Sequence, residues 1–182
     1  MYWFKSKERL LINVFLITLL TACKPDVKEA GATLKYFDLQ GYFSREAARL
    51  TKMNRSVLKT VSHNGVTESK KVHIGNWARE LDLFIGSDIN RPAWKDSYTV
   101  SNSDNILLYR AKYPELATRE IIIKRENRQV KWILIFNGTK NKLYQTIGKL
   151  TYYPDSLYAI SKFQKVLFLG NNSYKVQGVF NR

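Results

Sequence analysis

The second half of the chain is a succession of β-patterned segments, and this pattern constrains the fold more than any other feature. Apolar and polar residues alternate over short stretches, which are separated by polar turns rich in Asn, Asp and Gly. Short turns join antiparallel neighbours, because a parallel connection needs a crossover of about a dozen residues or more. The six predicted strands are residues 106–113, 119–125, 130–136, 143–153, 165–169 and 173–180.

Three of these segments carry more specific expectations. Residues 130–136 have apolar side chains on both faces, which predicts a central strand that is covered on both sides. Residues 173–180 alternate polar and apolar side chains, which predicts a half-exposed edge strand. Gly148 lies inside the segment 143–153 and marks a plausible β-bulge.

Two helices are predicted before these strands. Asp38 can cap the first helix, and Phe37 can act as the hydrophobic staple before the cap. Asn76 can cap a second, shorter helix. The apolar positions that share one face are Leu39, Phe43, Ala47 and Leu50 in the first helix and Trp77, Leu81 and Phe84 in the second.

A β-hairpin is predicted between the two helices. Residues 57–63 and 66–74 flank Asn64-Gly65, a dipeptide that supplies the positive φ angles of a type I′ turn. This turn sets a register in which His63 lies opposite Val66 and His73 lies opposite Ser56. The two histidines are therefore not neighbours, and the hairpin is not expected to hold a two-histidine metal site.

The element order predicts an α+β fold. We expect two N-terminal helices packed on a curved antiparallel sheet of about six strands, with the early hairpin in addition. A strongly curved sheet that wraps a helix would be similar to the half-barrel of periplasmic lipoprotein carriers. That likeness rests on element order alone and carries no information about function.

The N-terminus has the pattern of an export signal. A basic start with Lys5, Lys7 and Arg9 precedes the apolar stretch 10–20. This stretch is too short to span a bilayer, since a transmembrane helix needs about 20 apolar residues. A basic start, a short apolar core and small residues are typical of a secretory signal peptide.

The residues that follow resemble the lipobox of bacterial lipoproteins: Leu20-Thr21-Ala22 and then Cys23, the only cysteine of the chain. The resemblance implies a removable signal peptide over residues 1–22 and a lipid, typically palmitate among its acyl chains, on Cys23. Residues 23–35 are then a flexible tether, and residues 36–182 a single α+β domain. Lys24 follows the cysteine, at the position where an Asp would imply retention in the inner membrane. We therefore expect an anchor in the outer membrane, on either its periplasmic or its surface side.

The chain is strongly basic, with 30 Lys+Arg against 15 Asp+Glu. Removal of the signal peptide leaves a net charge near about +13, which favours anionic partners. In the cell envelope these partners would be anionic lipid, acidic polysaccharide or an envelope protein, and no nucleic acid is expected. The alternative is that the charge only keeps the protein soluble.

No motif for catalysis, phosphate binding or metal binding occurs in the chain. We therefore expect no enzymatic activity, no metal and no cofactor. The alternative of an envelope-polymer hydrolase would require Asp82, Asp88, Asp96 or His73 to converge in one cleft. A second alternative is a carrier of a lipid or another apolar ligand, which would need a cavity between the sheet and the first helix.

The candidate binding segment is residues 89–96, within the irregular stretch 87–98. It combines Arg91, Trp94 and Lys95 on a loop, where binding residues concentrate, and Trp and Arg are enriched in interface hot spots. The alternative is that Trp94 only fixes the loop to the core. The function predicted from the sequence is that of a non-enzymatic binding or accessory lipoprotein with a basic surface for anionic partners.

Overall fold

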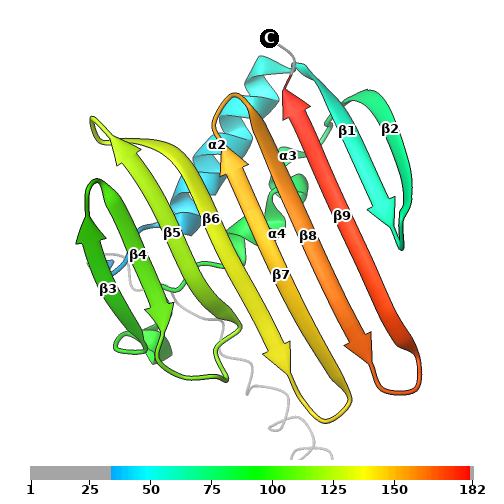
Figure 1. The fold of residues 1–182 in the computed structure, drawn as a ribbon. Helices are drawn as coiled ribbons and strands as arrows, with labels where there is room; N and C mark the ends of the chain where they lie inside the picture. Colours follow the sequence, from blue (N-terminus) through cyan, green and yellow to red (C-terminus); the bar gives the residue numbers. More distant parts are fainter. Residues whose placement is uncertain (1–33, 181–182) are drawn as a thin grey trace, which may run out of the picture. The chain divides into compact units, whose positions relative to one another are not determined.

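A computed structural model describes residues 34–180 of the protein. The predicted signal peptide over residues 1–22, the lipidated Cys23 and most of the tether lie outside the described residues. The described part is dominated by one antiparallel sheet of nine strands in the order β2-β1-β9-β8-β7-β6-β5-β4-β3 (Figure 1). The strands are β1 Ser56–His63, β2 Val66–His73, β3 Tyr98–Ser103, β4 Ile106–Ala111, β5 Thr118–Glu126, β6 Gln129–Lys140, β7 Tyr144–Tyr153, β8 Leu157–Val166 and β9 Gly170–Phe180.

The sheet is larger than the sequence predicts. The antiparallel pairing is confirmed, but the prediction of about six strands with a separate hairpin was wrong, since β1 pairs with β9 and the hairpin extends the same sheet. Strand β3 was missed because its exposed residues after Tyr98 are mostly small and polar. Strand β8 begins at Leu157 rather than near residue 165, because Ser, Lys and Gln side chains obscure the alternation over its second half.

Helix α2 (Leu39–Met53) begins where the sequence predicts. The Asp38 carboxylate accepts a hydrogen bond from the Gly41 amide at 2.7 Å, which confirms the cap. Phe37 contacts Tyr42 with ring centroids 5.7 Å apart, which is the expected staple between the positions before and after the first turn. Asn54 adopts a left-handed conformation and ends the helix.

The second predicted helix is divided into two single turns, α3 (Trp77–Glu80) and α4 (Asp82–Ile85). Asn76 caps α3 through the Arg79 amide, as predicted. Leu81, at the break, is fully buried, and Trp77 and Phe84 are buried with it. The prediction that these three apolar residues share a buried face is therefore confirmed, whereas the prediction of one continuous helix was wrong.

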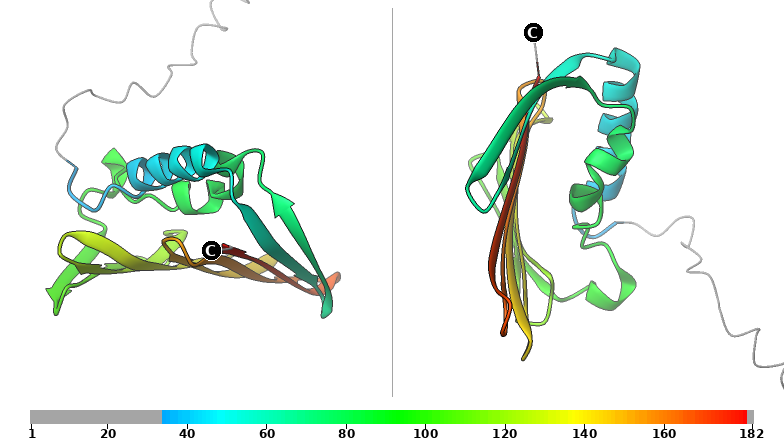
Figure 2. Two further views of the ribbon diagram at one scale, coloured as in Figure 1. Left: turned by 90° about the horizontal axis from the view of Figure 1, so that it is seen from above. Right: turned by 90° about the vertical axis from the view of Figure 1, so that its right-hand side faces the viewer.

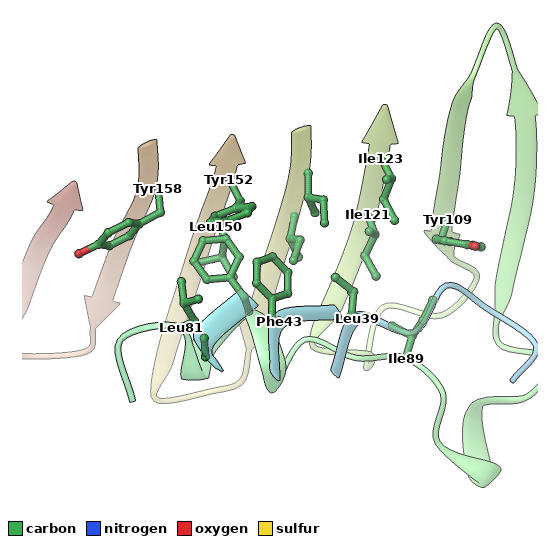
Figure 3. Close-up of a cluster of buried hydrophobic side chains, with 14 of the residues drawn as sticks. Leu39, Phe43, Leu81, Ile89, Tyr109, Ile121, Ile123, Leu150, Tyr152 and Tyr158 are labelled. Carbon is green, nitrogen blue, oxygen red and sulfur yellow. The ribbon is translucent and has the colours of Figure 1, made fainter. Parts of the chain in front are cut away.

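Among the described residues, the α-helices α2, α3 and α4 lie on one face of the sheet, and no α-helix of this part of the chain lies on the other face (Figure 2). Figure 3 shows Leu39 and Phe43 of α2 pointing at the side chains of the central strands, among them Ile121, Leu150 and Tyr152. Each large apolar side chain buried in this way stabilises the fold by about 1.5–3 kcal/mol. The helix-covered face is therefore the hydrophobic core.

Two tyrosines connect the sheet to the helices by polar bonds as well as by packing. The Tyr152 hydroxyl donates to Glu46 of α2 and the Tyr158 hydroxyl donates to Glu80 of α3, both at 2.5 Å. Burial, with the neighbouring carboxylate as a second cause, raises the pKa of both hydroxyls well above the ordinary value. Both tyrosines are therefore hydrogen-bond donors throughout the neutral pH range.

Three expectations about the sheet are corrected by the pairing. Residues 130–136 have one covered face, on which Ile133 and Ile135 are buried, and not two. Strand β9 is not an edge strand, because it pairs with β1 and β8. The register is regular through Gly148, and the irregularities lie instead between Thr118 and Glu120 and between Lys124 and Arg125.

The type I′ hairpin turn and the histidine register are confirmed. Asn64 and Gly65 have φ angles of 48° and 89°, and His63 pairs with Val66 while His73 pairs with Ser56.

Replacement of Gly178 by a residue with a side chain is predicted to destabilise the fold, whereas replacement of Gly148 is predicted to be tolerated. A Cβ atom at Gly178 would lie 2.1 Å from Cε1 of Tyr158, which packs across the glycine, while one at Gly148 would meet its nearest atom at 3.6 Å. We expect Gly178→Ala to lower the free energy of unfolding by about 2 kcal/mol and Gly148→Ala to change it by less than about 0.5 kcal/mol. Urea unfolding of the two variants measures the difference, and equal stabilities would contradict the packing described.

Candidate binding face

The face of the sheet that carries no helix is named the open face. Strand pairing places a continuous row of side chains across it, from Leu108 and Ile122 through Leu134 to Thr151. Trp132 and Phe136 flank Leu134 on the same face of β6, because side chains along a strand alternate. These apolar side chains are only partly buried, so the open face presents apolar and aromatic surface in the absence of a partner.

Cations surround this apolar surface. Lys149 lies opposite Phe136 and Lys175 lies opposite Ser161, in the row that also contains Arg110 and Glu120. The Lys149 ammonium lies 5.9 Å from the centroid of the Phe136 ring. The cationic side chains that the register assigns to the open face of the described strands are Lys71, Arg110, Lys124, Lys140, Lys149, Lys165 and Lys175.

The negative charge of this row is already neutralised. Glu120 accepts a hydrogen bond from Arg110, with Nε and Oε2 2.8 Å apart. Lys149 and Lys175 are exposed. The open face therefore has an excess of positive charge that is available to an anionic partner.

A groove of about 560 Å³ opens at one end of this face, beside the loop between β4 and β5. It is wide and shallow, so it suits a flexible or extended ligand better than a small molecule that must be enclosed. The residues that line it are Arg110, Ala111, Lys112, Tyr113, Pro114, Arg119, Glu120 and Phe136. The groove combines three cations with two aromatic rings, which is a suitable environment for phosphate or carboxylate groups on an amphipathic molecule.

The candidate loop residues Arg91, Trp94 and Lys95 lie elsewhere, around the 3-10 helix η2 (Pro92–Trp94). The structure brings two of them together, since the Arg91 guanidinium lies 4.4 Å from the centroid of the Trp94 ring. Trp94 is partly buried against the core and contacts Tyr98. The Lys95 side chain is exposed, while its carbonyl accepts a hydrogen bond from the Tyr36 hydroxyl at 2.6 Å.

The start of the described chain is attached to this same loop. Lys35 and Asp96 form an exposed ion pair of 2.5 Å. Their hydrogen bond lowers the pKa of Asp96 and raises that of Lys35 from the ordinary values. Tyr98 lies beneath the loop, and burial raises its pKa to about 12. The loop therefore holds the first described residues of the chain in place, and its use in binding stays a prediction.

Two of the candidate hydrolase residues, Asp88 and His73, lie at opposite ends of α2. Asp88 accepts a hydrogen bond from the Gln40 amide at the beginning of α2, whereas the His73 ring contacts the Asn54 carbonyl at the end of that helix. The length of α2 separates these sites by about 20 Å. No group of three His, Cys, Asp or Glu residues within residues 34–180 is arranged to hold a metal ion.

A carrier of an apolar ligand would need a cavity between the sheet and the helices that is large enough for that ligand. A small pocket at the end of this interface is lined by Leu50, Trp77 and Phe180 among others and has a volume of about 10 Å³. A cavity of that size holds at most about one water molecule. An acyl chain does not fit there.

Sequence reasoning missed the open face, although a signal for it was present. After Glu126, Asp155 is the one acidic residue, while Lys and Arg recur through every remaining strand. Asp155 lies in the turn between β7 and β8, where it pairs with Arg49 of α2 at 2.7 Å. The charge asymmetry could be counted in the sequence, but only the register assigns each lysine to a face.

The chain matches no family model, no curated protein and no solved structure. Within the described residues, no helix has the length and apolar character needed to cross a membrane. Its function must therefore be argued from the geometry of the domain.

Two side chains of the loop around η2 are expected to contribute differently to the stability of the fold. Trp94→Ala removes a partly buried ring from the core and is expected to lower the free energy of unfolding by about 2 kcal/mol. Arg91→Ala removes an exposed cation–π contact and is expected to cost at most about 1 kcal/mol. Thermal unfolding measures both. Equal stability of Trp94→Ala and the unsubstituted protein would contradict the packing role of Trp94.

Proposed function

We propose that the protein is a non-enzymatic binding or accessory lipoprotein of the outer membrane, which presents its open face to an anionic component of the cell envelope. The observation that carries the proposal is the composition of the uncovered face of the sheet. One face is closed by helices and packed, while the other exposes apolar side chains among uncompensated lysines and a basic, aromatic groove. A surface of this composition favours partners with phosphate or carboxylate groups.

The proposed anchor is the acylated Cys23. Ten residues, 24–33, separate it from the first described residue, and a chain of that length spans at most about 36 Å when extended. The domain would therefore stay close to the membrane surface that holds the acyl chains, where anionic headgroups and polysaccharides are concentrated. Two or three acyl chains are sufficient for stable attachment.

The anchor is tested in a bacterial host with a radioactive fatty acid. We expect the unsubstituted protein to be labelled and to sediment with outer membranes. Cys23→Ser removes the sulfur that accepts the lipid, so this variant is expected to lose the label. An unlabelled wild-type protein, or label retained by Cys23→Ser, would contradict the proposed anchor.

The binding surface is tested with a defined polyanion, dextran sulfate, and with neutral dextran as the reference. Lys149→Gln/Lys175→Gln removes two exposed cations of the open face, and we expect it to weaken polyanion binding about fivefold or more. Lys52→Gln/Lys70→Gln removes two exposed cations of α2 and of the opposite face, and serves as the matched control. Equal losses in both double variants would mean that net charge, and not the open face, determines binding.

A further inference from the structure

Two neighbouring turns expose a cluster of large apolar side chains at one end of the sheet. Leu143 lies in the turn between β6 and β7, and Leu167, Phe168 and Leu169 lie in the turn between β8 and β9. Their exposed fractions are 67%, 52%, 95% and 80%. These four residues are named the apolar tip. Isolated exposed apolar residues are ordinary, but four together at the end of adjacent strands indicate an interaction site.

The two turns form one structural unit. The Leu167 amide donates a hydrogen bond to the Leu143 carbonyl at 2.9 Å, and the pair Tyr144 and Val166 joins the strands immediately beside it. Both turns lie at the same end of the sheet, beyond the helices (Figure 1). Their side chains therefore project together from the end of a rigid sheet.

The fold itself does not require these apolar side chains. Phe168 has a φ angle of 67°, a conformation that Asn or Gly adopts at lower cost than a bulky residue. Its ring is almost completely exposed and so gains little from packing within the chain. A residue that is unfavourable for the turn and unused by the core points to a role outside the domain.

The charged side chains that flank the two turns in the sequence are all positive. Lys140, Lys142 and Lys165 are exposed and flank the two turns. No acidic residue occurs in the sequence 127–154 or 156–180, and Asp155 lies in the turn at the other end of β7 and β8. The lysine stems can lie along an apolar surface while their ammonium groups stay in a polar layer.

We propose that the apolar tip docks on an anionic lipid bilayer. Leu143, Phe168 and Leu169 would enter the boundary between headgroups and acyl chains, while the flanking lysines would contact lipid phosphates. A second copy of the chain is a less suitable partner, because two facing tips would bring their lysines together. The contact does not need the acyl anchor, and it shares Lys140 and Lys165 but none of its apolar side chains with the open face. It would fix the orientation of the tethered domain at the membrane.

Vesicle flotation of the unacylated chain 24–182 tests this proposal. We expect binding to vesicles that contain phosphatidylglycerol and little binding to phosphatidylcholine alone. Phe168→Asn/Leu169→Ser is expected to lower the partition coefficient about tenfold or more. Asn suits the positive φ angle, so the unfolding midpoint should be maintained. Leu83→Ser/Val100→Asn removes two exposed apolar residues outside the tip and is expected to bind like wild type.

The charge contribution is tested by Lys140→Gln/Lys142→Gln/Lys165→Gln, which should abolish the preference for phosphatidylglycerol. In the variant Leu169→Trp, the fluorescence of the introduced indole should be quenched by lipids brominated in the acyl chain. The proposal is overturned if wild type does not float with anionic vesicles, if the tip variant floats equally well, or if the new Trp is not quenched. It is overturned in favour of self-association if wild type is a dimer without lipid and Phe168→Asn is a monomer. Dextran sulfate binding by Phe168→Asn/Leu169→Ser distinguishes this outcome from a failure of the proposed function. The variant should bind dextran sulfate like wild type if the open face is the polyanion site.

Discussion

The contact between the apolar stripe of α2 and one face of the sheet determines the rest of the structure. Leu39, Phe43, Ala47 and Leu50 are buried on that face, and two further helical turns fill the space beside them. A layer of this size covers only part of a nine-stranded sheet. The strands β6 to β9 are 10 to 12 residues long, so they extend for about 33–40 Å, whereas α2 is about 22 Å long. Their far ends and the whole second face therefore remain outside the core.

Polar side chains fix this arrangement at both ends of the helical layer. Glu46 accepts from Tyr152 and pairs with Arg49, and Glu80 accepts from Tyr158 and pairs with Lys59. Each of these partly buried carboxylates is thus shared between a tyrosine of the sheet and a cation, which avoids the cost of an unpaired charge in a desolvated position. The covered face is consequently packed, and these two carboxylates on it are paired. Chemistry that involves a partner is left to the open face and to the ends of the strands.

The sequence predicts local structure better than it predicts the sheet. The Asp38 cap, the helical stripe of α2 and the Asn64-Gly65 turn were predicted correctly because each depends on residues within a few positions. The position of β9 between β1 and β8 depends on pairing across more than one hundred residues, which no local pattern encodes. For the same reason, the sequence shows that Trp132 and Phe136 share one face of their strand. It does not show that this face of the sheet is uncovered. The loop with Trp94 was predicted as a candidate site from its composition. The basic open face could not be predicted, because only the strand register shows which lysines share that face.

The central claim is that the uncovered side of the sheet faces an envelope partner in the cell. Hydroxyl-radical footprinting of the protein in isolated outer membranes and of the purified chain tests it directly, through oxidation of Trp132 and Phe136 on the open face and of Trp94 in the loop. The account predicts that Trp132 and Phe136 are oxidised in the purified chain and protected in membranes, while Trp94 reacts equally in both. Equal oxidation of Trp132 and Phe136 in the two samples would show that the open face is free in the membrane and would contradict the account.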